Sequence, residues 1–124
     1  MAKNMVLDTN FVLALFDQES VYNPLAIARL EQDGDIELLI PQIVVFELLV
    51  GEKEGEDIVG FCKMLVDGFI SNNKKDFEII RSINPEDRRK LKANDCMIFA
   101  LCKRYGAKLF TFDKKLAAIV NSKG

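Results

Sequence analysis

The stretch MVLDTNF at residues 5–11 decides the fold, because an apolar run ends there in an acid followed by two hydrogen-bonding side chains. Successive apolar residues of this kind predict a buried strand, which would deliver Asp8 to the carboxyl edge of a sheet. Open α/β sheets keep their chemistry at that edge. Asp8 also has a plainer interpretation as the N-cap of a helix over residues 11–16. A functional role for Asp8 therefore depends on whether other acids converge on the same place.

Strand and helix patterns alternate along the rest of the chain. Strands are predicted at residues 5–7, 36–40, 77–80 and 108–112, the third of them near a sheet edge. Helices are predicted at residues 11–16, 24–33, 42–50, 58–69, 85–92, 94–105 and 114–120. Residues 43–50 are rich enough in β-branched side chains for a strand, but Pro41 and Gly51 bracket a helical length. This order predicts an α/β fold with a parallel sheet of about four strands and helices on both faces.

Length and composition predict one compact domain over residues 1–124, since 49% of the residues are hydrophobic. The N-terminus does not resemble a secretory signal. The longest apolar stretch, residues 38–50, is interrupted by polar side chains and is too short to span a bilayer. We therefore expect a soluble, cytoplasmic protein with no membrane partner.

The cysteine and histidine counts narrow the possible chemistry. Cys62, Cys96 and Cys102 are odd in number, lie in apolar surroundings and form no Cys-x-x-Cys pair, which predicts buried reduced thiols. The chain has no histidine. This composition argues against a zinc site and excludes Ser-His or Cys-His nucleophilic catalysis. Any chemistry must come from carboxylates, hydroxyls, amides and amines.

Charge is unevenly distributed along the chain. Residues 1–80 contain 6 Lys or Arg against 15 Asp or Glu, whereas residues 81–124 contain 11 against 4. This division allows a cationic surface to lie beside an acidic site, as a ligand with a phosphate backbone would require. The alternative is an ordinary solvated surface that is merely uneven.

Three further acids carry the functional argument. Glu47 is the only charged residue between Glu37 and Glu52, and on a helix it would share a face with apolar neighbours. Such a carboxylate costs several kcal/mol if left unpaired, so it needs hydrogen-bond donors or a cation. A salt bridge to a distant Arg or Lys is the structural alternative. Asp95 is predicted to point inward on its helix, and Asp113 ends the last strand as Asp8 ends the first, although each is also a plausible helix cap.

Four acids without matching bases would repel one another unless a cation neutralised them. Carboxylate ligands without His or Cys favour Mg²⁺ or Mn²⁺ over zinc. Two such ions roughly 4 Å apart can activate water and stabilise the leaving oxygen of a phosphodiester without a protein nucleophile.

These residues resemble the PIN-domain ribonucleases, including the VapC-like toxins of toxin–antitoxin pairs. The matching motifs are DTN at residues 8–10, VFEL at 45–48, DCMIFA at 95–100 and TFD at 111–113. The resemblance implies a three-layer α/β/α fold in which four acids ligate one or two Mg²⁺ or Mn²⁺ ions, namely Asp8, Glu47, Asp95 and Asp113. It also implies that Asn10 and Thr111 assist by hydrogen bonding, while Thr9 can equally be a residue that stabilises the turn.

The same resemblance implies metal-dependent cleavage of single-stranded RNA, a homodimer and, in the toxin branch, an inhibitory antitoxin. The departures from the family pattern are modest. They are Cys96 and Cys102, which stand where small residues are more usual. A haloacid-dehalogenase phosphohydrolase would have an acid where Asn10 stands. The competing hypothesis from another class is a non-catalytic PIN-like module that binds RNA or a protein.

The basic residues expected to meet RNA phosphates are Arg88, Arg89, Lys92, Lys114 and Lys115. Solvated helix faces are the alternative interpretation of each one. Tyr22 and Phe16 have the ring chemistry to stack on bases, but the sequence favours core positions for both.

Overall fold

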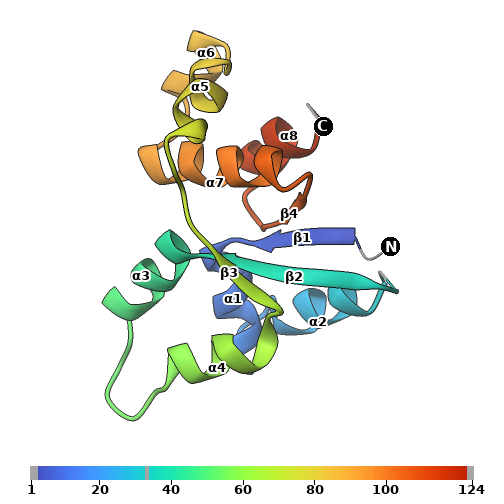
Figure 1. The fold of residues 1–124 in the computed structure, drawn as a ribbon. Helices are drawn as coiled ribbons and strands as arrows, with labels where there is room; N and C mark the ends of the chain where they lie inside the picture. Colours follow the sequence, from blue (N-terminus) through green and yellow to red (C-terminus); the bar gives the residue numbers. More distant parts are fainter. Residues whose placement is uncertain (1–2, 33, 123–124) are drawn as a thin grey trace.

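Four parallel strands form the centre of the computed structural model, which describes residues 3–32 and 34–122 (Figure 1). The strands are β1 (Lys3–Leu7), β2 (Ile36–Pro41), β3 (Gly68–Ile70) and β4 (Lys108–Phe110). They lie in the order β3-β2-β1-β4. In register, Leu7 of β1 lies beside Phe110 of β4. The parallel sheet predicted from the sequence is confirmed.

Helices cover both faces of this sheet. On one face lie α1 (Thr9–Phe16), α2 (Asn23–Gln32) and α4 (Ile58–Leu65), and on the other α7 (Ala93–Arg104) and α8 (Lys114–Ser122) (Figure 1). Helix α3 (Gln42–Val50) follows the carboxyl end of β2, and α5 (Lys75–Arg81) and α6 (Pro85–Arg89) lie on the α7 side. The three-layer α/β/α arrangement is therefore confirmed, and residues 43–50 are helical as predicted. Within the described ranges, no helix has the length and apolar character needed to cross a bilayer.

Apolar side chains from the strands and from both helix layers form one core. Val6, Leu7 and Ile40 are fully buried in the sheet. Phe11 of α1 and Ile98 of α7, two helices on opposite faces of the sheet, are also fully buried. Each such side chain stabilises the fold by about 1.5–3 kcal/mol relative to an exposed position. The buried strands explain why the apolar runs are continuous rather than alternating.

The three cysteines are buried and free, as predicted. Burial raises the pKa of all three thiols, and that of Cys102 reaches about 12. A thiol with a raised pKa is protonated at neutral pH and is a poor nucleophile or metal ligand. These residues therefore belong to the core.

The predicted third strand at residues 77–80 is wrong, because these residues belong to α5 and the third strand is β3. The predicted helix over residues 58–69 likewise ends at Leu65. Phe77 is exposed, whereas Ile79 and Ile80 face the core, which is a helical pattern rather than a strand pattern. Gly68, Phe69 and Ile70 pair with residues 39–41 of β2. Three residues are too few to show a periodicity in the sequence.

The strand order places a topological switch point between β1 and β4. From β1 the chain moves outward to β2 and β3, then crosses to the opposite side of β1 to form β4. Connections leave neighbouring strands in opposite directions at such a point and open a crevice at their carboxyl ends. Asp8 follows β1 there, and residues 111–113 follow β4. The fold thus brings two of the sequence motifs to one crevice.

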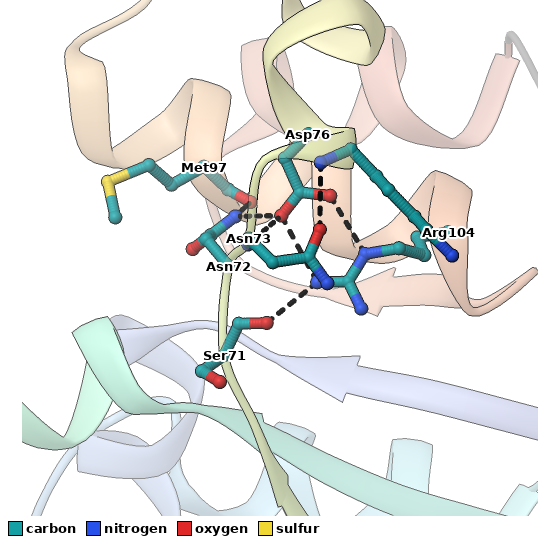
Figure 2. A network of polar contacts seen from close by, with 7 residues as sticks. Ser71, Asn72, Asn73, Asp76, Met97 and Arg104 are labelled. Atoms are coloured by element: carbon teal, nitrogen blue, oxygen red, sulfur yellow. Dashed lines mark hydrogen bonds and ion pairs between the residues drawn. The ribbon is translucent and has the colours of Figure 1, made fainter.

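A buried polar network joins α5 to α7 (Figure 2). The Arg104 guanidinium donates from Nε to Asp76 Oδ1 at 2.8 Å, from Nη2 to Asp76 Oδ2 at 3.1 Å, and from Nη2 to the Ser71 carbonyl at 2.6 Å. Asn72 donates to Asp76 and to the carbonyl of Met97 on α7. The Asp76 side chain is only 2% exposed. This network holds α5 on α7 and was not predicted from the sequence.

We expect Arg104→Ala to lower the free energy of unfolding by about 3 kcal/mol, because it leaves a buried carboxylate without its cation. Burial alone would raise the pKa of Asp76, but hydrogen bonds from Arg104, Asn72 and the Asn73 amide, with the Arg104 charge, lower it. The stability that this pair contributes is present above pH 3.8 and is lost as the pH falls through the lowered folded-state value. Urea unfolding at several pH values measures both effects.

Arg81→Ala is the matched control, because its ion pair with Glu78 is 3.6 Å long with both side chains 75% exposed. An exposed pair of this kind contributes about 0–1 kcal/mol. If Arg104→Ala were no more destabilising than Arg81→Ala, the buried network would not be a major source of stability.

Candidate active site

One pocket of about 270 Å³ lies at the carboxyl edge of the sheet and collects all four predicted acids. Asp8 reaches it from the end of β1, Glu47 from α3, Asp95 from α7 and Asp113 from the start of α8. The lining residues are Asp8, Thr9, Asn10, Leu13, Glu47, Lys92, Asn94, Asp95 and Asp113. Residues up to 105 positions apart in the sequence thus share one cavity.

Asp8 is the most enclosed of the four acids, with 8% of its surface exposed. Its Oδ2 accepts a hydrogen bond from Thr111 Oγ1 and its Oδ1 accepts one from the Thr9 amide, both at 2.8 Å. Burial raises the pKa of Asp8, the two hydrogen bonds oppose that shift, and the negative charges of Asp95 and Glu47 add to it. The pKa is raised overall. A cation in this pocket would therefore bind next to a carboxylate whose negative charge is poorly compensated.

Glu47 is held at both carboxylate oxygens by neutral donors. Thr9 Oγ1 donates to Oε1 at 3.0 Å, and Asn94 Nδ2 donates to Oε2 at 2.9 Å. The salt bridge considered for Glu47 is not formed, since the ion pairs in the described part of the chain are Arg81–Glu78 and Arg104–Asp76. Glu47 is thus oriented without losing its negative charge to a basic side chain.

Three of the acids also take part in helix capping. The Asp8 side chain caps α1, Asp95 Oδ2 accepts from the Lys92 amide at 3.3 Å at the start of α7, and Asp113 Oδ1 accepts from the Leu116 amide at 3.1 Å in α8. The capping interpretation is confirmed for Asp8 and Asp113. For α7 the N-cap is Lys92, and Asp95 accepts from it at the third helical position. All three arrangements are compatible with a shared site. Each helix presents its positive end to the pocket, where it favours negative charge. Capping therefore keeps carboxylates together that would otherwise repel one another.

The acids share the pocket without forming a preassembled metal site. Among the residues that the structure describes, no three acidic or thiol side chains lie close enough together to hold one ion. Their oxygens accept hydrogen bonds from backbone amides and neutral side chains, and such bonds stabilise the charged form of a carboxylate. The donor set still fits a hard divalent cation, because it consists of carboxylate, amide and hydroxyl oxygens. Within residues 3–32 and 34–122, Lys92 is the one basic side chain on the pocket wall.

Asn10 and Thr111 join the turns that follow β1 and β4. Asn10 Oδ1 accepts from the Phe112 amide at 3.0 Å and lies 3.3 Å from Thr111 Oγ1. Thr111 Oγ1 also accepts from the Asp113 amide at 3.1 Å. The Thr111 hydroxyl thus hydrogen-bonds both the Asp8 carboxylate and the Asp113 amide. These contacts hold together the two turns that carry Asp8 and Asp113.

The predicted basic residues do not all gather at this site. Lys92 lines the pocket, and Lys114 and Lys115 are exposed in the first turn of α8, directly after Asp113. Arg88 and Arg89 lie on α6 beside a different hollow. Of the predicted basic residues, Lys92 lines the acidic pocket, and Lys114 and Lys115 follow its lining residue Asp113 in the sequence.

Sequence reasoning missed three supporting residues. For Thr9 the sequence allows a turn-stabilising role equally well, and for Asn94 and Arg29 it indicates no role in the site. Arg29 Nη1 donates to the Thr111 carbonyl at 3.3 Å and so holds the turn that carries Asp113. The position of Asn94, directly before Asp95 at a helix start, is the one signal that was available. Partners of Glu47 that lie 38 and 47 residues away cannot be read from local patterns.

Comparisons with known proteins agree with this geometry. A family model described as "PIN domain" matches residues 5–121. Among solved structures, the VapC20 toxin of Mycobacterium tuberculosis, described as cleaving the sarcin-ricin loop, superposes with a TM-score of 0.71. It shares 19% identity, and the match covers 93% of this chain and 94% of that chain. No curated protein matches the sequence. At this identity the structural likeness shows a shared fold.

Proposed function

The chain belongs to the PIN-domain family, and from this membership we propose that it is an endoribonuclease that uses Mg²⁺ or Mn²⁺ to hydrolyse single-stranded RNA. The observation that carries the proposal is the convergence of four carboxylates in one pocket. None of the four has an Arg or Lys ion pair in the described part of the chain. The shared fold of VapC20, described as a toxin that cleaves the sarcin-ricin loop, supports the same reaction class.

In this proposal Asp8, Glu47, Asp95 and Asp113 hold the divalent cation. When bound, the cation supplies an activated water and neutralises charge on the phosphodiester. Thr111 keeps Asp8 turned toward the pocket, and Thr9 with Asn94 keeps Glu47 turned toward it. To join the ligand set, the Asp95 and Asp113 carboxylates must either break their hydrogen bonds to the helix amides or keep them through one oxygen while binding the cation through the other.

Basic side chains near the pocket are proposed to hold the RNA backbone. Lys92 is on the pocket wall, and Lys114 with Lys115 follows Asp113 on an exposed turn. Contacts of this kind position a strand without reading its sequence. Arg88 and Arg89 lie outside the pocket, so we assign them at most to a more distant part of the RNA.

We expect Asn94→Ala to weaken Mn²⁺ binding by about 10-fold, because outer-shell partners of metal ligands typically have effects of about 10- to 100-fold. The substitution removes one of the two hydrogen bonds that orient Glu47. Asn4→Ala is the matched control, because Asn4 makes a single 3.0 Å hydrogen bond to the Tyr105 carbonyl at the opposite end of β1. Mn²⁺ titration followed by electron paramagnetic resonance measures the affinity. Equal Mn²⁺ affinities of Asn94→Ala and Asn4→Ala would show that Asn94 does not support metal binding.

Incubation of the purified protein with a labelled single-stranded RNA tests the proposed activity directly. Cleavage is expected with Mg²⁺ or Mn²⁺ and not with excess chelator. The second candidate, a non-catalytic PIN-like module, predicts RNA or protein binding without cleavage under any metal condition. The four acids in one pocket favour the enzyme, because a binding module has no need for them.

A homodimer, an antitoxin partner and a cytoplasmic location stay predictions that rest on the family resemblance. The relative's description as a toxin makes an antitoxin the partner to look for first. Light scattering of the purified chain measures the oligomeric state. Co-purification with the product of a neighbouring small gene tests the antitoxin.

A further inference from the structure

Four aromatic rings form a column that runs from the core to the surface beside the acidic pocket. Phe110 stacks on Phe11 with ring centroids 4.9 Å apart, and Phe11 stacks on Phe112 at 5.4 Å. Tyr22 then contacts Phe112 at 4.9 Å. Phe11 and Phe110 are buried, Phe112 is half-buried, and Tyr22 is 50% exposed. The column therefore ends in an accessible tyrosine ring.

A cavity of about 340 Å³ lies at this outer end. Tyr22 and Phe112 line it together with Asn10, Leu13, Ala14, Asp17 and Ser20. This volume is within the range of about 300–1,000 Å³ that is typical of small-molecule sites. Asn10 and Leu13 also line the acidic pocket, so the two cavities are neighbours. Phe112 lies between Thr111 and Asp113 in the sequence. A ligand that extends from the acidic pocket across Asn10 meets these rings next.

Hydrogen bonds hold the segments that carry Tyr22 and Phe112. Asn23 Nδ2 donates to the Ala14 carbonyl at 2.8 Å, which fixes the start of α2 against α1. The Tyr22 amide donates to Ser20 Oγ at 3.2 Å, and the Phe112 amide donates to Asn10 Oδ1 at 3.0 Å. These hydrogen bonds hold the backbone that carries the two rings, and the rings contact one another. A preformed surface loses little entropy when a ligand stacks on it.

We propose that this cavity is a nucleobase subsite, in which an unpaired base next to the scissile phosphate stacks on Tyr22 and Phe112. The inference rests on the proposed ribonuclease function and adds a recognition element to it. Bases of single-stranded RNA stack on aromatic side chains, whereas paired bases cannot reach them. Stacking of this kind tolerates different bases, because every base has a π-face. Asn10 offers amide donors to the edge of the stacked base. The subsite therefore selects single strands over duplexes without requiring one sequence.

Tyrosine fluorescence tests the proposal, because the chain contains only Tyr22 and Tyr105 and no tryptophan. In an Asp8→Asn, Tyr105→Phe protein, Tyr22 is the sole tyrosine and cleavage is expected to be strongly reduced. Titration with a ten-residue oligoadenylate is expected to quench this signal. An abasic ribose-phosphate oligomer of the same length is expected to leave it unchanged. Quenching of equal size by the abasic oligomer, or no quenching by RNA that binds, would overturn the proposal.

Variants of Tyr22 give a second, independent readout. Tyr22→Ala is expected to weaken binding of the single-stranded RNA by roughly 5- to 100-fold, whereas Tyr22→Phe, which keeps the ring, should bind within about twofold of the parent. Phe77→Ala is the control, because it removes a 68% exposed ring on α5. Thermal melts verify that each variant is folded. If Tyr22→Ala in the Asp8→Asn background bound RNA as tightly as that background does with Tyr22 present, the subsite would be wrong and the exposed ring would be left for a protein partner.

These outcomes are separable from failure of the proposed function. The binding experiments use the Asp8→Asn background, so they report on the subsite whether or not the parent protein cleaves RNA. Absence of cleavage by the parent with Mg²⁺ and Mn²⁺ would contradict the enzyme and leave the binding result to be judged by itself.

Discussion

Asp8→Asn is expected to reduce RNA cleavage by about 1,000-fold or more while leaving the fold intact. The substitution removes the most buried negative charge of the pocket and with it a proposed metal ligand. Loss of a ligand that fixes the metal removes several kcal/mol of transition-state stabilisation, and each 1.36 kcal/mol is tenfold in rate. Single-turnover cleavage of a labelled single-stranded RNA measures the loss.

The hydrogen bonds around position 8 can survive this change. An asparagine oxygen can still accept from the Thr9 amide, and its Nδ2 can donate to Thr111 Oγ1. The Thr111 hydroxyl can then turn its own proton to Asn10 Oδ1, which lies 3.3 Å away. The variant therefore removes charge without leaving an unpaired polar group.

Stability is expected to move in the opposite direction to activity. Burial raises the pKa of Asp8, so the folded chain holds this proton at pH values where the unfolded chain has lost it. The fold therefore loses stability as the pH rises from about 3.8 through the raised value, and at neutral pH the ionised carboxylate is destabilising. Asp8→Asn removes that penalty, so without metal its melting temperature at pH 7 should equal or exceed that of the parent. A variant that melts lower and loses activity only by unfolding would contradict this interpretation.

Metal removal is the second change with a large expected effect. Excess chelator should abolish cleavage, and addition of Mg²⁺ or Mn²⁺ should restore it, because the pocket offers carboxylates and no histidine or cysteine that could act in their place. Bound metal should also stabilise the fold, by about 2.7 kcal/mol at a metal concentration 100 times the Kd. Cleavage assays and thermal melts in chelator, Mg²⁺ and Mn²⁺ measure both effects.

Asp8→Asn again supplies the control, because its melting temperature should respond much less to Mn²⁺ than that of the parent. Cleavage that continued at full rate in excess chelator would contradict a metal-dependent mechanism. It would also leave the four carboxylates without an explanation.

The sequence predicted the fold class correctly, and the structure brings the four candidate acids to one pocket. Asp8 and Asp113 were expected at one edge because parallel strands end at the same edge of a sheet. Both line the pocket, although β4 ends at Phe110 and Asp113 lies three residues beyond it. Glu47 was found because a lone acid in an apolar helix requires partners. Its actual partners, Thr9 and Asn94, come from other elements, and only the tertiary fold brings them to it.

In the sequence, helix capping and a place in a shared pocket are alternative interpretations of these acids, whereas the structure shows both together. Asp95 and Asp113 take part in helix capping and line the pocket at the same time. The third strand was misplaced because β3 has only three residues, and the apolar run at residues 77–80 belongs to a helix whose inner face packs on the core. Neither fact has a local signature.

The central claim is that four carboxylates from separate elements bind one or two divalent cations together. Mn²⁺ titration of the parent and of Asp8→Asn, Glu47→Gln, Asp95→Asn and Asp113→Asn, followed by electron paramagnetic resonance, tests it most directly. The account predicts that the parent binds Mn²⁺ and that each folded variant binds it at least about 10-fold more weakly. Affinities that are the same in the parent and in all four folded variants would contradict it.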